Sequence, residues 1–437
     1  MSGSPKHDHT WRNWTGDQIC HPASVVAPTT ADEVATAIAH AAERDWNVRV
    51  AGAGHSFIDA VSTDGMLLSL DRMNRVLDVE SSSGLVRVDA GITLNALNEA
   101  LAEHGLALKN LGDIDLQSLA GATASGTHGT GARLRNLSAG VHSVELVTAS
   151  GEKIEVNASE DQDAWRAARV SLGALGVVTA MTLLTVPAFT LHAVDEPRPL
   201  DEVLAGLDEL ADSNDHFEFY TFPHSSLALT RTNNRVDDAP RPRSRMSAWV
   251  GDILLVNHAF GLVCRTGRRW PSMIPKLNRL AARAAGSRER VDRSDRIFAS
   301  PRRVRFTEIE YAIPRERAAE AVTAVRNVIE ERGFDVPFPL EVRFLAPDDA
   351  FLSPAFGRQT CCLSAHMFEG MTWGPYFHAV EDIMVGFGGR PHWGKRHFQS
   401  ASTLRPRYPA WDHFISIRDR LDPEGRFAND YLRRVLA

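Results

Sequence analysis

Four cysteines are few for a chain of 437 residues, and long uninterrupted apolar runs are missing. Cys20, Cys264, Cys361 and Cys362 include no Cys-x-x-Cys pair, and adjacent cysteines rarely bridge each other, so we expect no disulfide framework. No stretch of about 18 consecutive apolar residues exists, and the first residues lack the apolar core of a signal peptide. We therefore expect a cytoplasmic protein without a transmembrane helix, and peripheral membrane contact stays open.

The chain also lacks an excess of positive charge, because 48 Lys and Arg face 55 Asp and Glu, a net charge of −7. This balance argues against a global electrostatic grip on nucleic acid. The 17 histidines are scattered, without His-Glu-x-x-His or another tight ligand spacing, so we expect no metal site. Apolar residues make up 43% and charged residues 24%, which is typical of globular proteins and excludes a disordered or coiled-coil chain.

Helical and strand patterns alternate along the first 190 residues. Apolar residues at intervals of three and four predict helices, and short β-branched runs bounded by glycine predict strands. The expected helices there are 30–44, 94–104 and 163–170, and the expected strands are 47–51, 66–70, 85–89 and 177–186, with a hairpin of 141–149 and 153–156. In the second half we expect strands at 306–313 and 340–345 and helices at 315–332, 377–386 and 412–421.

Two stretches of the second half are rich in arginine. Residues 231–245 combine Arg with Asp, Asn and Pro, a composition that predicts an exposed loop. Residues 276–306 are interpreted as a solvated helix and its flank, and the alternative is a basic surface that meets anionic lipid or a partner.

The first candidate for chemistry is Val50–Phe57, where a predicted strand runs into Gly52-Ala53-Gly54-His55. Residues with little or no side chain allow backbone N–H groups to approach a phosphate closely. A dinucleotide-binding fingerprint would continue into a helix, and none begins after Gly54. The alternative is an ordinary turn between two strands.

Two further small-residue segments follow, Leu119–Gly131 and Leu172–Val178. The first adds several hydroxyl groups to a nearly bare backbone, which suits a buried pyrophosphate held by main-chain N–H and hydroxyl groups rather than by lysines. Each segment alone is consistent with close packing. Three such segments near predicted strand ends indicate one extended nucleotide cofactor.

Together these segments resemble the FAD-binding half of the vanillyl-alcohol-oxidase (p-cresol-methylhydroxylase-like) flavoproteins. The resemblance implies FAD, wrapped by the GxGHS and SGTHG segments, and a covalent bond from His55 to the flavin 8α-methyl carbon; a hydrogen bond without that link is the alternative. An N-linked imidazole raises the potential of the isoalloxazine. The implied FAD-binding residues are Ala51, Gly52, Ala53, Gly54, His55, Ser56, Ser118, Gly121, Ala122, Ser125, Gly126, His128, Gly129, Gly173, Gly176, Val177 and Val178.

Charged residues interrupt apolar patterns in the second half. Glu341 and Arg343 share one face of the predicted strand 340–345, and such a pair is costly to bury without a purpose. A salt bridge on a wet face is the alternative. Lys395 ends the unusual run Pro-His-Trp-Gly-Lys, and His366 lies in a mostly apolar run, where a histidine is more often a core residue than a catalyst.

The order of Glu-Val-Arg, Ser-Pro-Ala-Phe-Gly-Arg, His366 and His-Trp-Gly-Lys is similar to that of the aldonolactone and alditol oxidases, over nearly the whole chain. The resemblance implies hydride transfer from a hydroxyl-bearing carbon to flavin N5. It assigns Lys395 to polarise or deprotonate the reacting hydroxyl. Arg343 would supply charge to the flavin and orient Glu341, and Glu341, Ser118 and His366 would contact the substrate.

We therefore expect an α+β protein with an FAD-binding domain at 1–190, a substrate (cap) domain on an antiparallel sheet at 191–415, and a segment 416–437 that returns to the first domain. The leading interpretation is an oxidase of L-gulono- or D-arabinono-type 1,4-lactones that passes electrons to O2 and yields H2O2. Alternatives are an alditol oxidase acting on a polyol, a lactone dehydrogenase with another acceptor, a non-catalytic flavin-binding sensor and a metal-dependent hydrolase. No nucleic-acid partner is expected, and the oligomeric state stays open.

Overall fold

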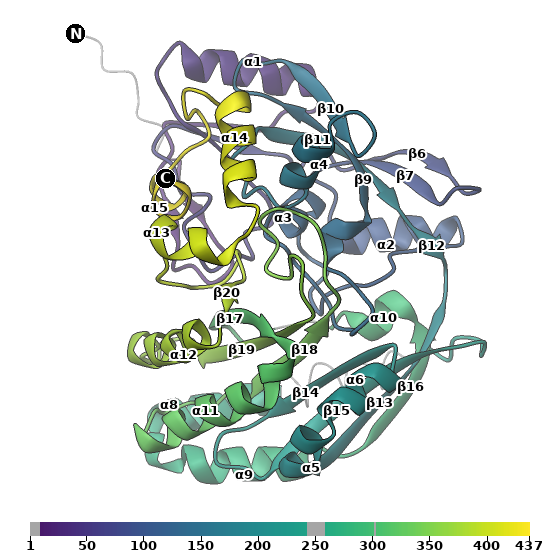
Figure 1. The fold of residues 1–437 in the computed structure, drawn as a ribbon, viewed down its shortest axis with the longest axis vertical. Coiled ribbons are helices and arrows are strands. Elements are labelled where there is room, and N and C mark those ends of the chain that lie inside the picture. Colours follow the sequence, from purple (N-terminus) through teal and green to yellow (C-terminus); the bar gives the residue numbers. More distant parts are fainter. Residues whose placement is uncertain (1–8, 243–257, 301–302) are drawn as a thin grey trace.

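The structure, a computed structural model, describes residues 9–242, 258–300 and 303–437 (Figure 1). The N-terminal part contains a three-stranded parallel sheet of β3 (Ser24–Val26), β5 (Met66–Ser69) and β4 (Val48–Ala51), in that order. Helix α1 (Ala31–Ala42) connects β3 to β4, and the Thr30 side chain caps its first turn by accepting from the Glu33 N–H. Because β3 and β4 run in the same direction on the two sides of β5, the chain needs such a crossover between them.

A second N-terminal sheet is antiparallel, in the order β10-β9-β11-β7-β6. Its strands are β6 (Val76–Glu80), β7 (Leu85–Asp89), β9 (Val141–Val147), β10 (Lys153–Asn157) and β11 (Val177–Leu184). The helices α2 (Leu94–Glu103), α3 (Leu119–Ala124) and α4 (Gln162–Arg169) lie between these strands in the sequence. The paired strands β1 (Trp11–Arg12) with β2 (Ile19–Cys20), and β8 (Leu106–Ala107) with β12 (Val186–Pro187), complete this part.

An eight-stranded sheet, β16-β13-β15-β14-β18-β19-β17-β20, dominates the second part. Its strands are β13 (Thr190–Pro199), β14 (His216–Thr221), β15 (Leu227–Val236), β16 (Arg288–Arg293), β17 (Phe306–Pro314), β18 (Leu340–Leu345), β19 (Thr360–Phe368) and β20 (Arg390–Pro391). All of its strand pairings are antiparallel. The helices of this part include α5 (Leu200–Ala205), α6 (Leu207–Ser213), α8 (Phe260–Arg269), α9 (Ile274–Ala284), α10 (Ser294–Phe298), α11 (Ala318–Glu331) and α12 (Gly374–Gly386).

The two faces of this sheet differ in chemistry because side chains alternate along each strand. Phe219, Val342 and Leu363 belong to one buried apolar cluster with Val322 of α11 and Phe377 of α12. Except for Cys362, the residues next to them in sequence are charged or polar, and they lie on the opposite face, which meets Asp113 and His128 of the N-terminal part. This polar face carries the candidate chemistry.

The last elements of the chain pack against the N-terminal part, and Figure 1 shows α14 next to α4. These are α13 (Ala401–Leu404), α14 (Trp411–Leu421) and α15 (Asp430–Leu436). Trp393, Phe414 and Leu432 join the same apolar cluster as Leu97 of α2 and Ala167 of α4. No helix among the described residues is long and apolar enough to cross a membrane.

Most of the expected elements are confirmed within one to three residues, including α1, α2, α4, α11, α14 and the hairpin β9–β10. The expected exposed loop at 231–245 is wrong in its first part, because β15 runs through Val236. Arg231 there is paired with carboxylates across the sheet, which offsets its charge. Residues 243–245 lie outside the described residues. The glycine-rich run that starts at Leu119 also contains the short helix α3.

Candidate active site

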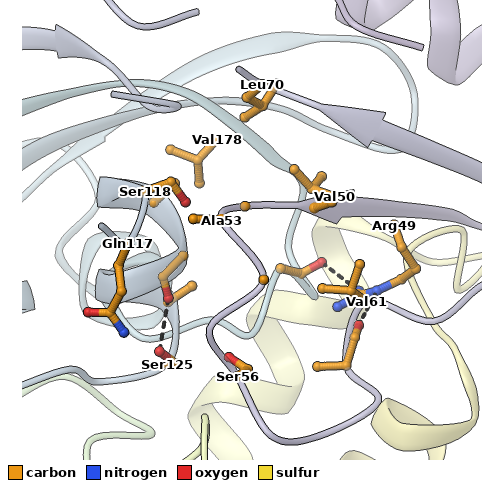
Figure 2. Close-up of a pocket in the computed structure, with 18 of the residues that line it drawn as sticks. Arg49, Val50, Ala53, Ser56, Val61, Leu70, Gln117, Ser118, Ser125 and Val178 are labelled. Carbon is orange, nitrogen blue, oxygen red and sulfur yellow. Dashed lines mark hydrogen bonds between the residues drawn. The ribbon is translucent and has the colours of Figure 1, made fainter. Parts of the chain in front are cut away.

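A pocket opens between three segments of the N-terminal part (Figure 2). Its walls include the loop after β4, the start of α3 and the loop before β11. Of the described residues that line it, Arg49 is the only lysine or arginine.

Gly52 marks a close approach between two of these segments. A Cβ atom built on Gly52 would overlap the Ser118 hydroxyl, so a larger residue at this position would force that hydroxyl to move. The Ser118 Oγ is buried without a hydrogen-bond partner, and Figure 2 shows it directed toward the loop at Ala53. An unpaired buried hydroxyl in a pocket wall fits a ligand with polar oxygens, such as the pyrophosphate of FAD.

Most of the implied FAD-binding residues line this pocket. They are Ala51, Gly52, Ala53, Gly54, His55, Ser56, Ser118, Gly121, Ser125, Gly173, Gly176 and Val178. The other five lie elsewhere: Ala122 and Val177 are core residues, Gly126 packs near Pro354, and His128 and Gly129 belong to the loop that follows α3. The three segments singled out in the sequence therefore all reach one pocket, and the pleat and the loop path decide which of their residues line it.

Arg49 holds the loops of this pocket together through hydrogen bonds to their main chain. Its guanidinium donates to the carbonyl oxygens of Ala60 (2.7 Å), Leu172 (2.9 Å), Gly173 (3.2 Å) and Phe427 (2.6 Å). Only 4% of Arg49 is exposed, and burial lowers its pKa to about 10. Because its donors are used on main-chain oxygens, we interpret Arg49 as a brace for the pocket loops rather than as a phosphate ligand.

His55 lies at the end of the pocket next to the polar face of the large sheet. Its ring stacks on Trp14, with 5.8 Å between the centroids. Burial first, and then the positive charge of Lys395, lower the pKa of His55 below its usual value. His55 is therefore neutral at neutral pH and keeps a free lone pair on one ring nitrogen.

The polar face of the large sheet brings Glu341 and Arg343 together with residues of other strands. Arg343 forms an ion pair with Glu341, donates to Glu218 of β14 (2.7 Å) and lies 3.7 Å from Asp113. The Tyr220 hydroxyl donates to both Glu218 (3.0 Å) and Glu341 (3.2 Å). The guanidinium of Arg343 thus lies within ion-pair distance of three carboxyl groups.

Lys395 lies at the other end of this face, beside Glu308 of β17. The Lys395 ammonium forms an ion pair with Glu308, and His366 Nε2 lies 3.6 Å from Glu308 and 3.9 Å from Glu341. Burial would lower the pKa of Lys395, but the carboxylates of Glu308 and Glu310 outweigh it and the pKa is raised. Lys395 is therefore an ammonium ion at neutral pH, which can polarise a hydroxyl but cannot accept its proton.

His128 carries a second buried charge. Its Nδ1 is 2.8 Å from the Gly129 carbonyl oxygen, and its Nε2 is 2.6 Å from Glu310. Both neighbours are acceptors, so both ring nitrogens carry protons. Burial opposes this charge, but the Cys362 and Glu310 side chains next to the ring raise the pKa of His128 well above its usual value. The ligand atoms of His128, Glu310 and Cys362 lie within 4.8 Å of one another, and we assign no metal to them because the hydrogen bond occupies two of the three.

Carboxyl groups outnumber cations on this face. Burial raises the pKa of Glu341 to about 7, Arg343 opposes the rise, and the carboxylates of Asp113, Glu218 and Glu308 add to it. A carboxyl group that titrates near neutral pH is suited to general base catalysis.

The structure thus brings Glu341, Arg343, His366 and Lys395 together on the polar face. It places Ser118 in the wall of the pocket between the three N-terminal segments. Sequence analysis missed Glu218, Tyr220, Glu308, Glu310 and Asp113. The signal was present in two cases: Phe-Thr-Glu-Ile-Glu-Tyr and His-Phe-Glu-Phe-Tyr show the same alternation of acidic and apolar residues as the strand of Glu341.

Comparison with known proteins agrees with this geometry. The family model described as "D-arabinono-1,4-lactone oxidase" matches residues 181–435, and the model described as "FAD binding domain" matches residues 22–157. The chain belongs to the aldonolactone oxidase family. FAD is its cofactor, as the resemblance implied.

Relatives align over almost the whole chain. The L-gulono-1,4-lactone dehydrogenase of Mycobacterium tuberculosis is 51% identical, covering 98% of this chain and 99% of that protein. The L-gulonolactone oxidase of Mus musculus is 35% identical (97% and 98%). The alditol oxidase of a Streptomyces species is 32% identical (97% and 98%).

Solved structures confirm the expected fold. A solvent-stable cholesterol oxidase superposes with a TM-score of 0.83 at 19% identity, covering 98% of this chain and 99% of that chain. At this identity the likeness concerns the fold alone. The chain is an α+β flavoprotein with the vanillyl-alcohol-oxidase fold and an antiparallel-sheet second part, as the sequence predicted.

Proposed function

We propose that this aldonolactone oxidase family member oxidises the hydroxyl-bearing carbon next to the carbonyl of a sugar-derived 1,4-lactone, of the L-gulono or D-arabinono type. The observation that carries the proposal is the buried polar face beside the FAD pocket, where the Lys395 ammonium and the Glu341 carboxyl group, whose pKa is near neutral, are connected through Glu308 and His366. The names of the relatives support this substrate class. A non-catalytic sensor would not need such a set of buried charges.

Oxidation of a hydroxyl-bearing carbon removes one hydride and one proton. FAD, when bound, supplies the two-electron acceptor that takes the hydride. We assign the proton to Glu341, whose carboxylate form is half populated near pH 7. Lys395 then acts by donating a hydrogen bond to the reacting oxygen, because its ammonium is fixed by Glu308. This narrows the sequence prediction, which left Lys395 either to polarise or to deprotonate the hydroxyl.

We assign the remaining predicted residues to positioning Glu341 or to binding the substrate and FAD. Arg343 holds Glu341 through their ion pair and brings positive charge to the site, and His366 lies between the carboxylates of Glu308 and Glu341, where it can contact a substrate hydroxyl. Ser118 contributes its free hydroxyl to the wall of the FAD pocket. We therefore propose Ser118 as a cofactor contact first.

We also propose that His55 carries FAD covalently. A neutral imidazole can act as the nucleophile toward the 8α-methyl carbon, and burial keeps His55 neutral. The link forms one N–C bond, releases one proton from the imidazole and one from the methyl group, and leaves two electrons on the isoalloxazine for the electron acceptor to remove. Precipitation of the purified protein with acid checks this: the yellow colour should stay with the pellet, and in His55→Ala it should pass to the supernatant.

For the electron acceptor there are two candidates. Oxygen, which would yield H2O2, follows from the mammalian relative named an oxidase. An acceptor other than oxygen follows from the Mycobacterium tuberculosis relative, which is named a dehydrogenase. We favour the second because that relative is far more similar to this chain.

The test is flavin bleaching by L-gulono-1,4-lactone and by xylitol, first without oxygen and then under air. We expect bleaching by the lactone, slow recovery and little H2O2 under air, and fast recovery with an artificial acceptor. Bleaching by xylitol alone would identify an alditol oxidase instead. Lys395→Met should lose turnover by orders of magnitude and keep FAD, whereas Lys109→Met, which changes an exposed lysine, should not. Full turnover in Lys395→Met would refute the assignment.

A further inference from the structure

The site described above gives no function to a helical hairpin on the outside of the second part. It consists of α8, the short turn Pro271–Met273 and α9, and we call it the basic hairpin. Figure 1 shows it at the end of the molecule farthest from α1. Its residues overlap the arginine-rich stretch for which the sequence left a solvated helix and a lipid-facing surface as alternatives.

The basic hairpin exposes large apolar side chains. Leu262 is 60% exposed, Trp270 53%, Met273 40% and Leu280 63%. These are four of the ten exposed large apolar residues in the part of the chain that the structure describes. Single exposed apolar residues are common, but a group on neighbouring elements marks an interaction surface.

Its charges have one sign. The exposed cations are Arg265, Arg268, Arg269, Lys276, Arg279 and Arg283, and the sequence has no Asp or Glu between residues 258 and 288. Arg268 donates to the Glu369 carbonyl oxygen and Arg269 lies over the Trp270 ring. Among the described side chains, no carboxylate forms an ion pair with Lys276 or Arg283. Lys276, Leu280 and Arg283 share one face of α9, opposite the buried Ile274, Asn278 and Ala282.

We propose that the basic hairpin docks on the surface of a membrane that contains anionic phospholipids. Interleaved Arg, Lys, Trp and Leu side chains on an exposed helical face are the composition of an interfacial helix, in which cations meet lipid phosphates and apolar side chains enter the headgroup boundary. A second copy of the chain fits poorly, because symmetric pairing of this surface would place cations against cations. The proposal does not depend on the proposed substrate.

The hairpin is also connected to the polar face of the sheet. Phe260 of α8 packs against Phe338 with 4.8 Å between ring centroids, and Phe338 in turn stacks on His366 at 5.7 Å. The inner side of the hairpin thus forms an outer wall of the catalytic region. Docking would place this wall at the lipid surface, and an electron acceptor dissolved in the lipid would then lie near the catalytic region.

The experiment is co-sedimentation of the full-length holoenzyme with vesicles of phosphatidylcholine alone and of equal parts phosphatidylcholine and phosphatidylglycerol. We expect binding to the anionic vesicles only, weakened by salt. The double variant Lys276→Gln/Arg283→Gln should bind about 30-fold more weakly at low salt, which corresponds to about 1 kcal/mol for each cation. The control Arg72→Gln/Lys109→Gln removes two exposed cations elsewhere and should bind like the parent.

A second pair of variants separates charge from apolar insertion. Trp270→Ser and Leu280→Ser should each weaken vesicle binding while lactone turnover in solution stays unchanged, since neither side chain reaches the catalytic region. Equal binding to both vesicle types, or equal binding by the double variant and the parent, would overturn the proposal. A dimer in solution that these variants dissociate would also overturn it, because the surface would then be covered by a second copy.

Discussion

Replacing Arg49 by Met tests whether this residue is the brace of the FAD pocket. The change keeps much of the side-chain volume but removes four charge-assisted hydrogen bonds to carbonyl oxygens of three separate segments. Unpaired buried polar groups cost about 1–3 kcal/mol each. Removing the buried charge also removes its desolvation cost, which offsets part of this loss. We therefore expect the free energy of unfolding to fall by about 4 kcal/mol.

Two measurements check this expectation. Differential scanning calorimetry should show a lower Tm for Arg49→Met with and without FAD, and titration of the apoprotein should show weaker FAD binding, because Leu172 and Gly173 lose their anchor. Arg49→Lys keeps the charge but not the planar fork, and it should recover only part of the loss. Arg72→Met changes an exposed arginine and should behave like the parent. An Arg49→Met protein with unchanged Tm and FAD affinity would refute the reasoning.

Other expected outcomes concern single residues. Gly52→Ala should fold but bind FAD poorly, as measured by flavin fluorescence on titration, because its Cβ would overlap the Ser118 hydroxyl; tight binding would contradict the close approach. The kcat for the lactone should rise with pH through about 7 as Glu341 loses its proton, and Glu341→Gln should lose most activity together with that rise. Because the pKa of His128 is raised on folding, its contribution to stability is complete below pH 6.5 and is lost as the pH rises through the folded value. His128→Gln should therefore have a lower Tm at pH 6 and a smaller further fall at alkaline pH than the parent.

The sequence predicted elements well where one physical signal dominates. The helix at 315–332 and the strand at 340–345 have clear apolar periodicity, and α11 and β18 lie there. The strand β15 was missed because Thr, Arg and Asn dominate its second half, and the partners that make Arg231 tolerable, Asp195 and Glu218, come from other strands. Charge pairing across a sheet has no local signature.

The site shows the same division. Motifs indicated the three loops that line the pocket and the residues Glu341, Arg343, His366 and Lys395, which the structure brings together. They could not indicate that Glu308, 87 residues before Lys395, fixes it as an ammonium ion, because only the pairing of β17 with β20 and with Arg396 after it brings the two side chains together. A role that depends on a protonation state can be assigned only when the charged neighbours of the residue are known. The fold determines which neighbours these are.

The loop after α3 has a consequence for how substrate enters. Gly131 donates to the Phe344 carbonyl oxygen (2.8 Å), Thr130 accepts from the Phe344 N–H (3.2 Å), and the Thr130 carbonyl oxygen accepts from His216 (2.9 Å). Together with the His128–Glu310 pair, these bonds join the cofactor-binding part to three strands of the eight-stranded sheet, β14, β17 and β18. Parting the two halves to admit the proposed substrate would break all of these bonds at once. We therefore expect traffic through the rim while the halves stay joined, so that loop residues at the rim, rather than hinge residues, decide how fast substrate arrives and product leaves.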